Sequence, residues 1–156
     1  YLAYRYVGDR ATCQSLAEAM GVDAGPLELP DDATGERDVL AEAAQYALEH
    51  DVAPALTDPF ARSRAGDARI LVQCLDRKRR YGQAIERLEC EDLGALLGKK
   101  PRILATGLAA LDRAIRARKL PDDAIAAYLL RRSLRDEWLF APAAALYPDR
   151  RWSKID

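Results

Sequence analysis

The sequence PRILATGLAALDRAIRARKLPDDAIAAYLLRRSLRDEW, residues 101–138, predicts two amphipathic helices joined by a short turn. The first follows Pro101 and carries apolar side chains at helical spacing: Leu104, Leu108, Leu111 and Ile115. The second carries a similar series: Ile125, Leu129, Leu130, Leu134 and Trp138. Residues 120–123 (LPDD) form the connection between the two helices, and a connection this short predicts that the helices are antiparallel neighbours.

The remainder of the chain has the same helical character. Alanine is the commonest residue and β-branched residues are scarce, a composition that favours helix over strand. Further helices are predicted over residues 9–20, 36–49 and 58–90, with short turns at 92–97 and 142–148. We therefore predict an all-α fold, a single antiparallel, bundle-like domain of five to seven helices that spans residues 1–156.

Local signals set the predicted boundaries of these helices. Residues 57–59 (TDP) form a helix start, because a capping side chain precedes a proline at the first helical position. Gly21 and Gly98 stand where helices end. Gly82 lies within the apolar period of residues 60–88, and we expect it to divide that region into two helices.

The acidic side chains are concentrated in the first third of the chain. Residues 21–35 combine glycine, proline and acidic side chains without helical periodicity, which predicts an acidic loop. Residues 1–60 carry three basic side chains against twelve acidic ones, whereas residues 61–156 carry 21 basic against 13 acidic. Either the acidic third folds against the basic remainder, or the chain offers faces of opposite charge to outside partners.

Composition and cysteine usage restrict the class of protein. A chain of 156 residues can bury a core without disulfides or a metal. Cys13, Cys74 and Cys90 are far apart in sequence and show no paired spacing, so we expect reduced thiols and a cytoplasmic location. Apolar runs stay far below the ~20 residues that span a bilayer, so we expect no membrane partner.

The sequence holds no motif for catalysis, for a metal or for a cofactor, and we predict neither catalytic residues nor a cofactor. His50 is the only histidine and lies between Glu49 and Asp51. Neighbouring residues on a helix point about 100° apart, so these three side chains cannot converge. Residues 94–100 (GALLGKK) lack the spacing, the hydroxyl residue and the preceding strand of a phosphate loop.

Two groups of arginines are the candidate binding residues: Arg77, Arg79, Arg80, Arg131, Arg132 and Arg135. The first group surrounds one helical turn, and the second shares a narrow arc of a helix. Arginine forks suit carboxylate and phosphate partners, so these residues either offset the acidic third or bind an outside anion. For the second group we expect an outside partner, because its three arginines outnumber the neighbouring acids Asp136 and Glu137.

A resemblance to a known family rests on apolar spacings and turns at these positions: residues 52–56 (VAPAL), Arg64, Ala68, residues 70–71, the turn at 93–98, residues 115–116, Leu120 and residues 122–123. Through them the stretch 40–142 resembles an uncharacterised bacterial all-helical family, encoded near or fused to aminoglycoside-phosphotransferase-like kinases and acyl-CoA enzymes. The resemblance implies an all-helical accessory module. It implies no activity and no site residue.

We therefore expect a non-catalytic helical binding or regulatory module that engages a protein or an anionic ligand through a basic arginine face. Two alternatives stay open. One is an enzyme or enzyme subunit with a pocket that no motif marks. The other is a nucleic-acid-binding protein that uses the basic C-terminal two-thirds, for which a strong dependence of binding on salt is diagnostic.

Overall fold

The computed structural model describes residues 2–31 and 38–147, which contain helices and no strand, so the predicted all-α class is confirmed. In chain order the elements are α1 (Leu2–Met20), α2 (Val39–Tyr46), a π-helical segment (Ala47–Val52), α3 (Ala53–Ala55), α4 (Pro59–Leu97), α5 (Leu104–Arg116), α6 (Asp122–Leu139) and α7 (Ala141–Ala144).

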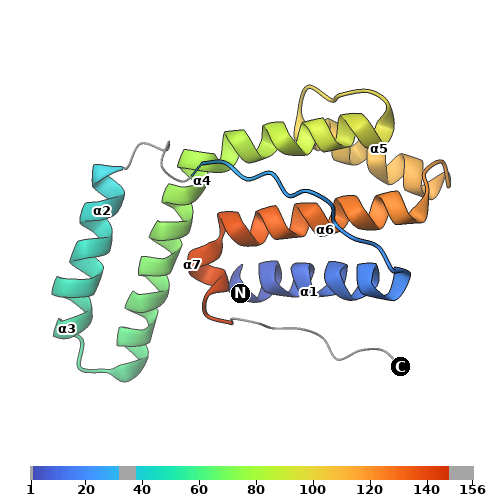
Figure 1. The fold of residues 1–156 in the computed structure, drawn as a ribbon. Helices are drawn as coiled ribbons and strands as arrows, with labels where there is room; N and C mark the ends of the chain where they lie inside the picture. The colour runs from blue at the N-terminus through green and yellow to red at the C-terminus, as the bar shows by residue number, and fades with distance from the viewer. Residues whose placement is uncertain (1, 32–37, 148–156) are drawn as a thin grey trace.

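The body of the molecule consists of α1, α5, α6, α7 and the C-terminal half of α4 (Figure 1). The predicted helix pair is present, although α5 and α6 both pack on α4 and do not run along each other. Their side chains meet at a core cluster of Leu93, Leu111 and Tyr128, of which Leu93 and Tyr128 are 0% exposed. A second cluster joins α4 to the end of α6: Tyr81, Ile85 and Leu139.

The predicted break at Gly82 is wrong. The helix α4 is continuous and also contains the turn that the sequence predicted separately at 92–97. A glycine costs a helix interior only about 1 kcal/mol. Tyr81 and Ile85 lie on either side of Gly82 and are 1% and 4% exposed. Burial of a large apolar side chain contributes about 1.5–3 kcal/mol, so packing on both sides outweighs the cost of the glycine.

The predicted helix ends at 58 and 98 are confirmed. The side chain of Asp58 accepts hydrogen bonds from the backbone N–H groups of Phe60 and Ala61 at 3.1 and 3.2 Å. Gly98 ends α4 in the left-handed conformation, with φ of 73°. The sequence leaves residues 1–7 open between an earlier turn of the helix predicted over 9–20 and a short strand. The structure has the helix, since α1 is helical from Leu2.

The helix predicted over 36–49 begins at Val39, after the cap Asp38, and its helical path continues to residue 55. The continuation is possible because the π-helical segment shifts the hydrogen bonding, and the N–H of Ala53 reaches the carbonyl of Leu48. Figure 1 shows that α2, α3 and the N-terminal half of α4 form a two-helix hairpin that extends away from the body. We call this hairpin, residues 39–75, the arm.

The acidic loop is present as an irregular segment over residues 21–31, which we call the strap; residues 32–35 lie outside the described residues. The strap crosses α6 towards α4 (Figure 1). Two arginines of α6 hold its backbone. Arg131 Nη1 donates to the carbonyl of Ala24 at 2.6 Å, and Arg135 Nε donates to the carbonyl of Glu28 at 3.2 Å.

Gly107 is the place where α5 approaches its neighbours most closely. A Cβ atom at this position would lie 2.7 Å from Pro101 Cγ and 2.8 Å from Leu93 Cδ1. Gly66, within α4, has nothing within 4 Å of the corresponding position. The two glycines therefore have different roles, because only Gly107 is required by packing.

Substitution of these glycines by alanine should change stability in opposite directions. Gly107→Ala is expected to lower the free energy of unfolding by about 1–3 kcal/mol through overpacking. Gly66→Ala is expected to raise it by about 0.5–1 kcal/mol, because alanine favours the helix and restricts the unfolded chain. Urea titrations of both variants measure the changes, and a stabilised Gly107→Ala variant would contradict the close packing of α5.

Candidate functional site

Arg135 lies in a buried cluster of charged side chains between α4 and α6. Arg135 and Glu89 are each 2% exposed. Arg135 Nη1 donates to Glu89 Oε1 and to Asp92 Oδ2, both at 2.7 Å. These carboxylates are 46 and 43 residues away in sequence. Because a buried charge is costly without its counter-charge, this cluster links α4 to α6 inside the molecule.

Two more α6 side chains complete the cluster. The hydroxyl of Tyr128 donates to Glu89 Oε2 at 2.9 Å. Burial and the nearby Glu89 raise the pKa of Tyr128, so the hydroxyl keeps the proton that it donates. Arg131 Nε donates to Asp92 Oδ2 at 3.0 Å, in addition to its bond to the strap. Both carboxylates of α4 are thus held by partners within the chain.

The other candidate arginines also have partners within the chain. Arg77 donates to the backbone carbonyls of Leu139 and Trp138, at 3.2 and 3.0 Å, at the C-terminal end of α6, where a cation is favourable. Arg79 forms an ion pair with Asp38, the N-cap of α2, at 3.1 Å, and Arg80 forms one with Asp76 of α4 at 3.6 Å. Arg132 Nε lies 3.9 Å from Asp136 of the same helix.

The six candidate arginines are therefore not gathered on one open face. An outside partner was expected for residues 131–135 because few acidic residues lie near them in the sequence. The structure instead supplies their acidic partners, Glu89 and Asp92, from α4. A role of these arginines in binding stays a prediction, and their internal contacts do not favour it. Sequence reasoning missed Glu89 and Asp92 as their partners.

The charge split of the sequence is only partly matched by contacts. Among the ion pairs that join described residues of the first sixty to the rest are those of Arg79 with Asp38, Arg69 with Glu49 at 3.7 Å, and Arg10 with Glu137 at 2.7 Å. In the pair of Arg10 with Glu137 the charges are reversed, because the arginine belongs to the acidic third and the carboxylate to the basic remainder. Among the described residues, Arg131 and Arg135 contact the strap through its backbone carbonyls and not through its carboxylates.

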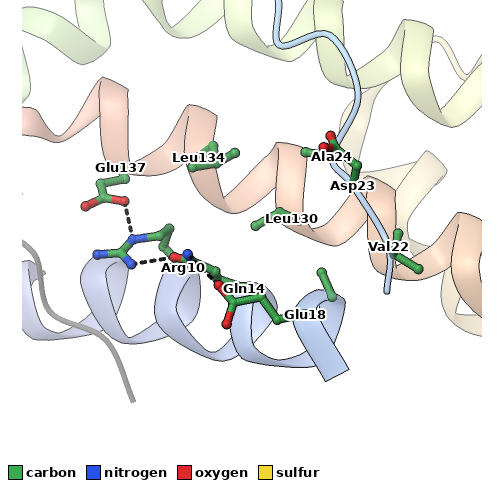
Figure 2. A pocket seen from close by; sticks show the side chains of 10 residues that line it. Arg10, Gln14, Glu18, Val22, Asp23, Ala24, Leu130, Leu134 and Glu137 are labelled. Carbon is green, nitrogen blue, oxygen red and sulfur yellow. Dashed lines mark hydrogen bonds and ion pairs between the residues drawn. The ribbon is translucent and has the colours of Figure 1, made fainter. Parts of the chain in front are cut away.

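A groove of about 470 Å³ lies between α1, the strap and α6 (Figure 2). Figure 2 shows Arg10 at one end, where Nε donates to Glu137 Oε2 at 2.7 Å and Nη1 donates to Gln14 Oε1 at 2.9 Å. Gln14 in turn donates to Glu18 Oε1 at 2.9 Å. These polar side chains bind one another along the α1 wall, and the bond from Arg10 to Glu137 joins α1 to α6.

The chain on both sides of α5 and along it is rich in basic side chains. Residues 98–121 hold one acid, Asp112, against seven exposed basic side chains, which we call the α5 basic face: Lys99, Lys100, Arg102, Arg113, Arg116, Arg118 and Lys119. Lys100 pairs with Glu91, and Arg116 pairs with Asp112, each at 2.9 Å. The other five basic side chains form no ion pair with any residue that the structure describes.

A shallow depression of about 750 Å³ adjoins the α5 basic face. Its lining combines apolar side chains, among them Leu97 and Ile103, with the basic side chains of Lys99 and Arg102. Ile103 is 62% exposed. The combination offers apolar contact next to positive charge.

A comparison of the chain with protein-family models, with curated proteins and with solved structures finds no match. The family resemblance of residues 40–142 accordingly stays a prediction. In the described ranges, 2–31 and 38–147, none of the helices has the length and apolar character needed to cross a bilayer. The same residues contain no group of three or more His, Cys, Asp or Glu side chains placed to hold a metal ion.

Proposed function

We propose that this chain is a non-catalytic helical binding module that engages an acidic segment of a partner protein through the α5 basic face. The observation that carries the proposal is the set of five exposed basic side chains on this face that pair with no acid among the described residues. A face of one charge sign attracts a partner of the opposite sign and speeds their encounter.

The surface between these charges favours a protein partner over a nucleic acid. Ala105, Thr106 and Ala109 are small and exposed, so a partner helix can approach α5 closely. Residues 98–121 contain no aromatic side chain, the group on which unpaired bases stack. The exposed Ile103 and the adjoining depression add apolar contact, which suits an amphipathic segment.

The proposal also agrees with the rest of the molecule. The polar side chains along the groove of Figure 2 are bound to one another, which favours a binding module over the enzyme alternative. The three cysteines are free, which suits a reducing compartment. We therefore propose a cytoplasmic location.

Removal of three charges from the α5 basic face should weaken binding of an acidic probe. The variant Lys99→Gln/Arg102→Gln/Arg113→Gln is expected to bind a fluorescein-labelled poly-glutamate peptide about tenfold more weakly than the wild type, because exposed ion pairs contribute about 0.2–1 kcal/mol each. Fluorescence anisotropy at low and physiological ionic strength gives the Kd. Wild-type binding should weaken with salt, and the variant should show a flatter dependence.

The matched control is Arg5→Gln/Arg62→Gln/Lys78→Gln, which removes the same net charge from exposed positions outside the α5 basic face. This control should bind the peptide like the wild type. If both variants weaken equally, net charge and not the face determines binding, and the proposal fails. A single-stranded oligonucleotide of the same charge that binds more tightly than the peptide would support the nucleic-acid alternative instead.

A further inference from the structure

The arm lacks a hydrophobic core of its own. None of the residues of α2, of the π-helical segment and of α3 is buried. Within residues 39–75, all of which are described, Ala65 and Cys74 are the only buried residues, and Cys74 packs against Ala143 of the body. Two helices alone have no interior in which to place large apolar side chains, and most helical stability in proteins comes from packing of such a face.

Large apolar side chains are instead exposed on both helices of the arm. In α2, Val39 and Leu40 are 75% and 81% exposed. In α4, Phe60 and Leu75 are 72% and 66% exposed, and Leu71 is 44% exposed. Large exposed apolar side chains concentrated on one segment are typical of an interaction surface.

The exposed positions of α4 form one seam, the outer stripe: Phe60, Arg64, Asp67, Leu71 and Leu75. Their spacings of four, three, four and four residues place them on one face of the helix, at the period of a helix that packs against another helix. Arg64 Nη1 pairs with Asp67 Oδ2 at 3.0 Å in the middle of the stripe, between the apolar ends.

The outer stripe is complementary to itself. When two copies run antiparallel about a two-fold axis between residues 65 and 66, Phe60 of one copy lies opposite Leu71 of the other. Arg64 of each copy then lies opposite Asp67 of the other, so the opposite charges of the two copies meet at the centre. A two-fold interface requires this kind of self-complementary patch.

We propose that a second copy of this chain covers the outer stripe, so that the two arms form an antiparallel four-helix bundle. In such a bundle the exposed apolar side chains of both arms are buried between the four helices. The interface is separate from the α5 basic face, which lies on the body, and it does not depend on the proposed binding of an acidic partner. A dimer would present two α5 basic faces.

Charge reversal at the centre of the stripe tests this dimer. Sedimentation velocity at about 100 µM, where interfaces of micromolar Kd are populated, should show a dimer for the wild type. Arg64→Glu and Asp67→Arg should each be monomeric, because each brings four like charges together at the two-fold axis. The double variant Arg64→Glu/Asp67→Arg should be a dimer again. An equimolar mixture of the two single variants should form a heterodimer.

The control Arg62→Glu changes an exposed charge outside the stripe and should remain a dimer. Circular dichroism of every variant should match the wild type, since all three positions are exposed. A monomeric wild type at this concentration would overturn the proposal. So would a monomeric double variant, or an Arg62→Glu variant that dissociates like Arg64→Glu. Binding of poly-glutamate by a monomeric wild type would leave the proposed function intact while the dimer fails.

Discussion

The variant Arg135→Met is expected to lose about 3–5 kcal/mol of unfolding free energy, because it leaves the buried charge of Glu89 without its main counter-charge. Arg135 and Glu89 are each 2% exposed and lie 2.7 Å apart, so water cannot replace the lost partner. Asp92 and the strap carbonyl of Glu28 lose a donor from the same guanidinium. A reversible urea titration, followed by circular dichroism, measures the change.

Two further variants separate the buried pair from a general effect of charge. Arg135→Met/Glu89→Met should recover part of the loss, because no buried charge is then left unpaired at position 89. Arg102→Met, at an exposed position of the α5 basic face, should change stability by less than about 0.5 kcal/mol. A loss below about 1 kcal/mol for Arg135→Met would show that this arginine is not part of the interior.

Leu111→Ala is expected to lower the free energy of unfolding by about 2–5 kcal/mol through lost burial and a residual cavity. Leu111 is 4% exposed and packs with Leu93 and Tyr128 where α5 meets α4 and α6. Ile115 belongs to the same apolar series but is 39% exposed, so Ile115→Ala is the matched control.

The control should lose clearly less stability than Leu111→Ala, because solvent already reaches the side chain of Ile115. Urea titrations of the two variants give both changes. Equal losses, or a loss below about half a kcal/mol for Leu111→Ala, would contradict the placement of Leu111 in the core.

Much of the helical framework could be predicted because its determinants are local. The apolar spacing of residues 104–138, the cap at Asp58 and the stop at Gly98 each depend on a few neighbouring residues. The continuity of α4 through Gly82 could not be predicted in this way. It depends on burial of Tyr81 and Ile85 against the end of α6, a long-range contact.

The partners of the arginines were missed for the same reason. The neighbours of residues 131–135 in sequence indicated an outside partner, whereas the structure supplies Glu89 and Asp92 from α4. One signal for Glu89 is present in the sequence. It lies four residues after Ile85 and four before Leu93, both buried, and an acid within a buried stripe requires a basic partner.

The α5 basic face was not among the binding residues predicted from the sequence. The basic side chains at the end of the helix predicted after Pro101 were visible in the sequence, and those at 99, 100 and 102 precede the same helix. Their exposure follows from the packing of α5 on α4. Charge counts along a sequence do not distinguish arginines that pair with acids inside the molecule from arginines that are exposed to solvent.

The surface that receives an acidic partner is located most directly by two-dimensional NMR of the isotope-labelled chain during titration with the poly-glutamate peptide. We expect the backbone amide signals of residues 98–121 to shift with added peptide and to return at high salt. The signals of residues 77–80 and 131–135 should stay in place, because those arginines have partners within the chain. Shifts centred on residues 77–80 and 131–135, with none in residues 98–121, would contradict the proposed binding surface.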